Sequence, residues 1–235
     1  MTRRVDERGR LRRAGLGAAI ALTAAVAALP AQPAGAAPER PATVNVVHGI
    51  PGVAVKVCVD GKPAVRDFRY GEKVVGATLP SGTHRVRVVP AGKACSARAV
   101  LKKKYDLQAG KNYTIVAALR PSGAPALAAF VNRVHPTDAG MARLTVRHTA
   151  EAPAVNVWAG STRLIGGTGF TWGEGRTFAP PKGTYRVKVT LPGSRRAVIG
   201  PRPLTLRAGK AYQVYAVGAP GDYRLVVVGV HVGDR

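Results

Sequence analysis

The side chains that most often perform catalysis are sparse in this chain of 235 residues and show no catalytic spacing. Residues 37–235 hold ten Asp and Glu, scattered singly rather than in the pairs that glycoside hydrolysis uses. Glu72 and Glu174 occur in similar surroundings, FRYGE and FTWGE, which indicates a shared structural role near a turn. GGTGFTWG (166–173) does not fit a phosphate-binding loop, because it lies between predicted strands and opens no helix. We therefore predict no catalytic residues and expect that the chain is not an enzyme.

His48 and His148 are the most notable titratable residues, because both follow a short alternating run of apolar residues. Val44, Val46 and His48 fall on one face of a predicted strand. This placement favours a buried histidine at a strand end, hydrogen-bonded to a nearby loop. A catalytic or metal-binding role would need partners at suitable spacing, and the sequence offers none. We predict no metal site and no cofactor.

Cys58 and Cys95 are the two cysteines of the chain. An even count in an exported protein favours a disulfide. The alternative is a pair of free thiols.

The N-terminus has the features of a secretory signal peptide. An Arg-rich start, MTRRVDERGRLRR (1–13), precedes the apolar stretch 14–30 and the small residues Ala34-Gly35-Ala36. We predict that residues 1–36 are removed at a signal peptidase site at Ala34 and Ala36; the alternative is a retained membrane anchor. The remaining chain carries 30 Lys and Arg against 10 Asp and Glu and has no transmembrane span. The predicted location is extracellular, with association to the cell wall as a further possibility.

Four blocks of sequence recur in the same order, which indicates an internal duplication. The pairs are VNVVHGIPGVAVKVCVDG (44–61) with LTVRHTAEAPAVNVWAG (144–160), FRYGE (68–72) with FTWGE (170–174), LPSGTHRVRV (79–88) with APPKGTYRVKV (179–189), and LQAGKNYTIVA (107–117) with LRAGKAYQVYA (206–216).

Each copy predicts short strands joined by tight turns. Apolar residues alternate with Arg in 84–88, and Val alternates in 53–59 before the turn pair Asp60-Gly61. About six or seven strands in each copy, at this spacing, are typical of an antiparallel sandwich. We predict an all-β chain of two tandem antiparallel β-sandwich, immunoglobulin-like domains, at 44–132 and 142–235. The Pro-containing connection between them should limit their range of orientations.

The repeated blocks resemble a bacterial family, domain of unknown function 4397. Its members begin with a VVHxSPDAPxVDVYVDG-like run and continue with a Gly-Glu after an aromatic residue, an LPxGxYxVxV hairpin and an LxAGxxYT strand. Both copies carry these blocks, but the first has IPGVAVKV where the family has acidic residues after the His. The resemblance implies export and a β-sandwich, and it implies no established activity.

Three aromatic residues are candidates for binding: Trp158, Trp172 and Tyr70. Trp158 is out of phase with Val155 and Val157, so it should face away from the core, where it could stack on a sugar ring or anchor a protein. The alternative is that Trp158 covers a sheet of its own sandwich. Trp172 and Tyr70 occupy equivalent positions of a predicted loop.

The polar faces of the predicted hairpins carry basic residues, among them Arg85, Arg87, Arg186 and Lys188. Outside a bacterium, such stripes would attract an anionic cell-wall polymer or glycan. The alternative is a solubilising surface that selects no ligand. Aromatic residues are not interleaved as in RNA-binding motifs, so we expect no dedicated nucleic-acid partner. The predicted function is a non-catalytic binding or structural module of the envelope; the alternative is an assembly or scaffold protein that acts through strand edges or protein partners.

Overall fold

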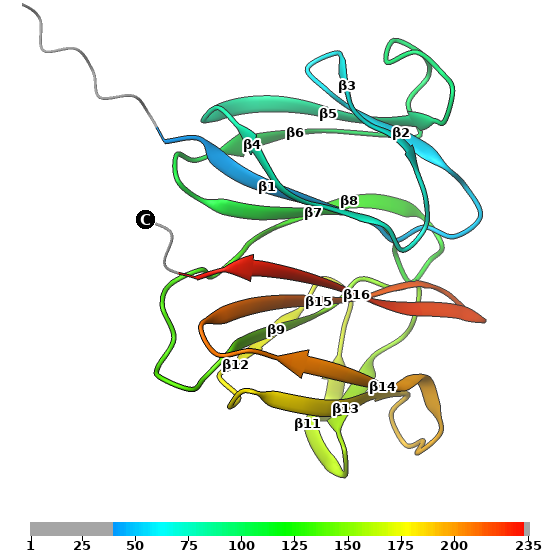
Figure 1. The fold of residues 1–235 in the computed structure, drawn as a ribbon. Coiled ribbons are helices and arrows are strands. Elements are labelled where there is room, and N and C mark those ends of the chain that lie inside the picture. The colour runs from blue at the N-terminus through cyan, green and yellow to red at the C-terminus, as the bar shows by residue number, and fades with distance from the viewer. Residues whose placement is uncertain (1–39, 233–235) are drawn as a thin grey trace, which may run out of the picture. The chain divides into compact units, whose positions relative to one another are not determined.

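The structure, a computed structural model, describes residues 40–232, which form sixteen β-strands and no helix (Figure 1). The first sandwich consists of β1 (Ala42–His48), β2 (Val55–Val59), β3 (Lys62–Phe68), β4 (Lys73–Leu79), β5 (Gly82–Pro90), β6 (Leu101–Leu107), β7 (Asn112–Leu119) and β8 (Pro125–Val131). The second consists of β9 (Arg143–His148), β10 (Val155–Ala159), β11 (Thr162–Phe170), β12 (Gly175–Phe178), β13 (Gly183–Thr190), β14 (Ala197–Leu206), β15 (Lys210–Ala219) and β16 (Asp222–His231). The predicted all-β sandwich fold is confirmed, with eight strands in each sandwich rather than six or seven.

Each sandwich is built from two four-stranded sheets, and the strand order is the same in both. The first outer sheet has the order β3-β2-β5-β6 and the first inner sheet β4-β1-β7-β8. The second outer sheet, β11-β10-β13-β14, and the second inner sheet, β12-β9-β15-β16, repeat these orders. Most pairs are antiparallel, but β1 with β7 and β9 with β15 are parallel.

Alternation along the strands separates the core from the surface, as β5 illustrates. Val86 and Val88 are buried, whereas Arg85, the residue before Val86, is exposed. The turn between β2 and β3 uses Asp60 and Gly61, both with positive φ (49° and 81°). Two successive positive φ angles are the geometry of a tight hairpin turn, which Asp-Gly adopts at low cost.

Three buried clusters lie between the sheets. The hydrophobic core of the first sandwich includes Val44, Val57 and Ile115. The core of the second includes Leu144, Val157 and Val214, which occupy the equivalent positions in the aligned blocks.

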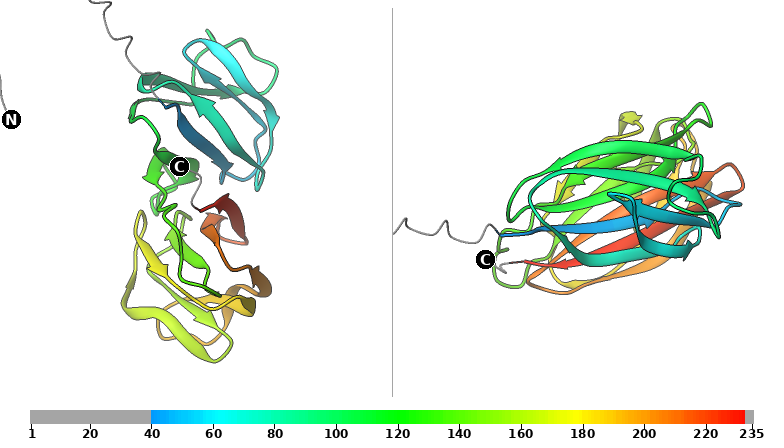
Figure 2. Two further views of the ribbon diagram at one scale, coloured as in Figure 1. Left: turned by 60° about the vertical axis from the view of Figure 1, so that its left-hand side comes forward. Right: turned by 90° about the horizontal axis from the view of Figure 1, so that it is seen from above.

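The third cluster joins the two inner sheets, so the sandwiches pack face to face as well as being connected in sequence. Val47 and Val116 of the first inner sheet and Val217 and Val228 of the second are each 0% exposed. This burial restricts the sandwiches more strongly than the connecting segment 132–141 would do alone. Figure 2 shows the arrangement from two further directions.

Candidate functional site

A fully buried histidine ends the first strand of each sandwich. His48 and His148 are 0% exposed, and their Nε2 atoms lie 2.9 Å from the carbonyl oxygens of Val53 and Pro153. Burial lowers the pKa of both imidazoles, although these hydrogen bonds oppose the shift. Each neutral ring therefore donates through Nε2 and accepts a backbone N–H at Nδ1. Both residues lie as the sequence predicted, at a buried strand end and bonded to a loop.

The same histidines hold a Gly-Glu turn through their backbone. The N–H of His48 donates to the carbonyl of Glu72 at 3.0 Å, and that of His148 to Glu174 at 3.1 Å. Each glutamate carboxylate in turn accepts the backbone N–H three residues before it, at 2.8 and 2.7 Å. These contacts explain why Glu72 and Glu174 occur in both copies: they fix a turn.

That turn directs Tyr70 and Trp172 toward the opposite sandwich. Trp172 donates from Nε1 to the carbonyl of Leu119 at 2.8 Å, and the Tyr70 hydroxyl donates to the carbonyl of Asp222. An arginine of the opposite sandwich lies over each ring, 4.7 Å from the centre of Trp172 and 4.2 Å from that of Tyr70. Burial raises the pKa of Tyr70 to about 12. Both aromatic residues pack against the third cluster and belong to the contact between the sandwiches.

The outer surface of the first outer sheet, termed the first outer face, concentrates positive charge on two adjacent strands. The register of β5 and β6 places Arg85 opposite Lys104 and Arg87 opposite Lys102. Arg85, Lys102 and Lys104 are exposed, and Arg87 is half-buried. Like charges directly opposite each other in an antiparallel pair are destabilising.

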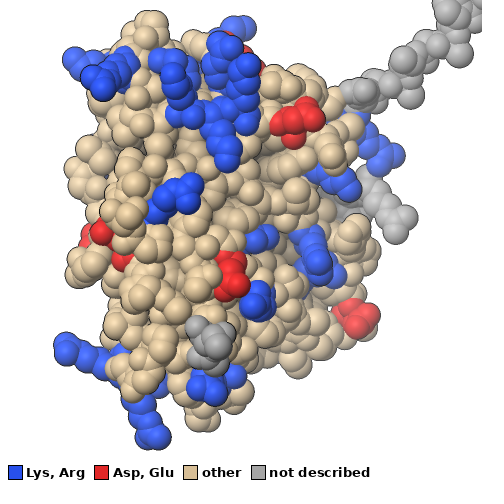
Figure 3. All heavy atoms as spheres, turned by 180° about the vertical axis from the view of Figure 1, so that it is seen from behind, with Lys and Arg blue, Asp and Glu red and all other residues tan. Residues whose placement is uncertain are grey.

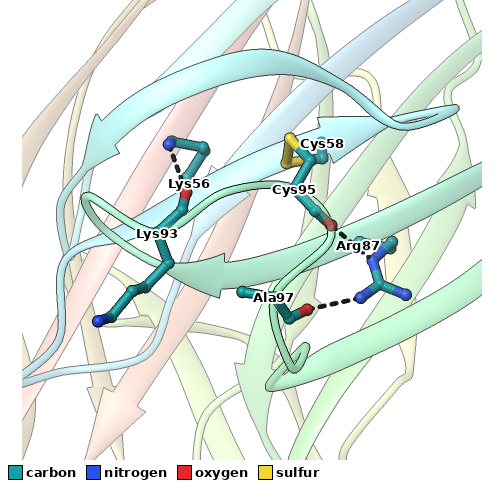
Figure 4. The surroundings of a disulfide bond; sticks show 6 residues. All are labelled: Lys56, Cys58, Arg87, Lys93, Cys95 and Ala97. Carbon is teal, nitrogen blue, oxygen red and sulfur yellow. Dashed lines mark hydrogen bonds between the residues drawn. A yellow bond between two sulfur atoms is a disulfide. The ribbon is translucent and has the colours of Figure 1, made fainter.

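A disulfide covers the centre of this face, and the predicted pairing is confirmed (Figure 4). Cys58 on β2 is 0% exposed and is bonded to Cys95 in the loop between β5 and β6. Arg87 holds the same loop, because its Nε donates to the carbonyl of Cys95 at 3.1 Å and its Nη2 to that of Ala97 at 2.7 Å. Two of the donors of Arg87 are therefore engaged within the protein, while Arg85 stays exposed.

The corresponding surface of the second outer sheet, the second outer face, carries Trp158 at the position of Cys58. Trp158 lies opposite Lys188 in the register of β10 and β13. Its Nε1 donates to Thr190 Oγ1 at 3.1 Å, and the Lys188 ammonium and the Arg163 guanidinium lie 5.3 and 5.9 Å from its ring centre. The indole is half-buried and lies on the face opposite the core. Arg186 is exposed.

Sequence reasoning missed the pairing of His84, on β5, with Asp60, in the turn between β2 and β3. His84 Nδ1 is 2.7 Å from Asp60 Oδ2, and His84 Nε2 is 2.9 Å from the carbonyl of Pro80. Burial lowers the pKa of His84, but these two hydrogen bonds outweigh it and raise the pKa above 6.5. Both ring nitrogens are occupied, so this pair links a turn to a strand rather than serving as a general base.

Across residues 40–232, no group of three or more His, Cys, Asp or Glu side chains is arranged to hold a metal ion. The same range contains no helix of the length and hydropathy that a bilayer crossing requires. The predicted signal peptide at 1–36, with Ala34 and Ala36, lies outside the described residues.

The comparison with protein families concerns mainly the first sandwich. A family model described as "Domain of unknown function (DUF4397)" matches residues 42–158. This match supports the family that the sequence resembles. It spans the first sandwich and reaches β10 of the second.

Other comparisons add little. No curated protein matches the chain. A solved structure, "The Bacillus anthracis TIE protein", is 13% identical with a TM-score of 0.22, over 76% of this chain and 34% of its own. The chain thus spans about a third of the length of that protein.

Proposed function

We propose that this chain is an exported, non-catalytic binding protein of the bacterial cell envelope, and that its first outer face holds anionic surface polymers. The observation that carries the proposal is the register of β5 and β6, with Arg85 opposite Lys104 and Arg87 opposite Lys102. Two like-charge pairs weaken the sheet on which they lie. A bound polyanion would remove this repulsion, and each cation that it neutralises would strengthen its binding.

The surroundings of these pairs suit an extended polymer. Figure 3 shows groups of Lys and Arg side chains at the top of the view, where the first outer sheet lies, with fewer Asp and Glu beside them. The loop beside the cations is fixed by the disulfide and by Arg87. A surface that is already ordered loses less conformational entropy when it binds.

We further propose that the two sandwiches are tandem copies of the DUF4397 domain, at 44–132 and 142–235. The identical strand orders and the equivalent His48 and His148 turns support this. Removal of the predicted signal peptide would leave a chain with 30 Lys and Arg against 10 Asp and Glu. Such a charge suits the anionic wall outside a bacterium.

Co-sedimentation with Gram-positive cell walls tests the function directly. The purified protein is mixed with walls that keep or lack their anionic polymers, over a series of salt concentrations. We expect binding that requires the polymers and declines steeply with salt, because contacts between exposed charges are screened. Replacing Arg85 and Lys104 by Gln should weaken binding more than replacing Arg195 and Arg196, which are also exposed but lie on a loop of the second sandwich.

Two outcomes would reject polymer binding on the first outer face. Equal effects of the two double variants would mean that net charge matters and the face does not. Binding that persists at high salt, or that does not need the anionic polymers, would instead favour a scaffold that contacts protein partners.

A further inference from the structure

A groove of about 470 Å³ lies at the end of the first inner sheet where β1 begins and β8 ends. It is lined by Arg40 before β1, by Lys111 and Asn112 at the start of β7, and by Asn132, Arg133 and His135 after β8. An adjoining hollow of about 220 Å³ shares Thr43 and Asn112 with it and reaches Gly229 on β16. The groove is within the size range of small-molecule binding sites.

The charge of the groove is positive. Three of its lining residues, Arg40, Lys111 and Arg133, are cationic and exposed, and no Asp or Glu lines it. Among the described residues, no hydrogen bond or ion pair engages the charged ends of these three side chains. They are therefore available to an anion.

Buried amides fix an additional donor in the groove. Asn112 Oδ1 accepts hydrogen bonds from Asn45 Nδ2 at 2.9 Å and from Asn132 Nδ2 at 2.8 Å. Because Asn45 is 0% and Asn132 4% exposed, these bonds hold the Asn112 amide in one orientation. Its Nδ2 has no partner among the described residues, and Asn112 is only half-buried. The Oδ1 of Asn132 also has no hydrogen-bond partner, but this atom is buried beneath the groove.

The amide network is specific to the first sandwich. The equivalents of Asn45 and Asn112 are Thr145 and Ala211, from the aligned blocks. Asn132 follows Val131, which pairs with Tyr113; the equivalent Tyr212 pairs with Gly229, so Val230 takes the place of Asn132. The shared scaffold therefore folds without these amides, and their presence calls for a separate explanation.

We infer that the groove binds a small oxyanion carried on a hydroxylated carbon skeleton, such as a polyol phosphate or a uronic acid. Arg40, Lys111, Arg133 and the Asn112 amide supply the charges and donors that phosphate or carboxylate oxygens accept. The groove and its adjoining hollow, about 470 and 220 Å³, leave room beside the oxyanion for the carbon skeleton. The site does not depend on polymer binding at the first outer face, because no residue of β5 or β6 lines it.

Calorimetric titration of the full-length protein with glycerol 3-phosphate, glucuronate, inorganic phosphate and neutral glycerol tests the site. The decisive variant is Asn112→Asp, which keeps an oxygen to accept from Asn45 and Asn132 but replaces the free amide donor by a negative oxygen. We expect saturable binding of at least one of the first two ligands, weakened roughly tenfold or more in this variant, the size of one lost charge-assisted hydrogen bond. Arg133→Gln should weaken binding several-fold, and Arg195→Gln, on an exposed loop outside both proposed sites, should leave it unchanged.

The two anions also distinguish the ligand's source. Tighter binding of glycerol 3-phosphate indicates a polyol phosphate, and tighter binding of glucuronate an acidic sugar. Inorganic phosphate should bind more weakly than the hydroxylated anions, and glycerol should not bind.

Three results would overturn the inference: no saturable binding at millimolar concentrations, equal affinity for inorganic phosphate and the hydroxylated anions, or an unchanged affinity in Asn112→Asp. If Asn112→Asp does not fold, Lys111→Gln with Arg133→Gln gives the same test. Neither variant should alter salt-dependent binding to walls through the first outer face, so the two sites can fail separately.

Discussion

The two outer faces share their strands and differ in how the centre of each is covered. At equivalent positions the first has Cys58 and the second Trp158, and the residue opposite is Arg87 in one and Lys188 in the other. On the first face the disulfide carries a loop over the sheet and Arg87 holds that loop. On the second the indole itself covers the sheet, with a cation over its ring.

The difference shows that two sandwiches with the same strand order can carry different surfaces. Covering a sheet with a loop requires a tether, because a loop of this kind has few apolar contacts of its own. Covering it with one large aromatic residue requires only a neighbour for the indole N–H, which Thr190 provides. The first face gains a fixed loop beside its cations, and the second gains an aromatic surface.

The largest effect should come from removing the disulfide. Replacing Cys58 and Cys95 by Ser opens a loop with a sequence separation of 37, which the chain-entropy model values at about 4 kcal/mol of unfolding free energy. Urea unfolding of the oxidised protein and the variant measures this loss. Hydrogen exchange should show lower protection in β2 and β5 than in β10 and β13. If protection fell equally in the two outer sheets, the disulfide would not stabilise the first outer sheet specifically.

A matched pair of alanine variants compares the residues opposite Cys58 and Trp158. Arg87→Ala removes two hydrogen bonds to loop carbonyls and should cost about 2 kcal/mol of unfolding free energy, because bonds from a charged donor are the stronger kind. Lys188→Ala removes a cation–π contact and should cost less than about 1 kcal/mol. Urea unfolding of both variants under one set of conditions gives the comparison. An equal cost would show that Arg87 is not needed to hold the loop.

Features set by local sequence were predictable, because each depends on the residues next to it in the chain or on the number of cysteines. The outward direction of Trp158 follows from its phase relative to Val157. The disulfide follows from two cysteines in a chain that the sequence predicts to be exported. The buried position of His48 follows from the alternation before it.

Features set by contacts between distant segments were not predictable. Trp172 donates a hydrogen bond to the carbonyl of Leu119 across the contact between the sandwiches. The periodicity of a strand does not indicate which of its exposed residues another domain will cover. The partners of Arg87 lie in a loop without regular pattern. The Asn45, Asn112 and Asn132 amides come from three segments that only the parallel pairing of β1 with β7 and the return of β8 bring together.

A smaller, pH-dependent effect should be confined to the first sandwich, because Tyr185 and Gly160 replace His84 and Asp60 in the second. Tyr185 donates to the carbonyl of Pro181 as His84 does to that of Pro80, but it carries no ion pair. Since the pKa of His84 is raised in the folded state, its stabilisation is fully present below 6.5 and is lost as the pH rises through the raised value. Asp60, whose pKa is lowered from 3.8, loses its contribution only in stronger acid.

Urea unfolding of the wild type and His84→Gln at several pH values isolates this pair. Both proteins keep His48 and His148, whose lowered pKa values make stability fall as the pH drops, so that trend cancels in the difference. The wild type should exceed the variant most in mildly acidic solution and least in alkaline solution. A difference that is constant with pH would mean that His84 acts through packing and its bond to Pro80 alone. The ion pair with Asp60 would then add nothing to the first sandwich that Tyr185 does not give the second.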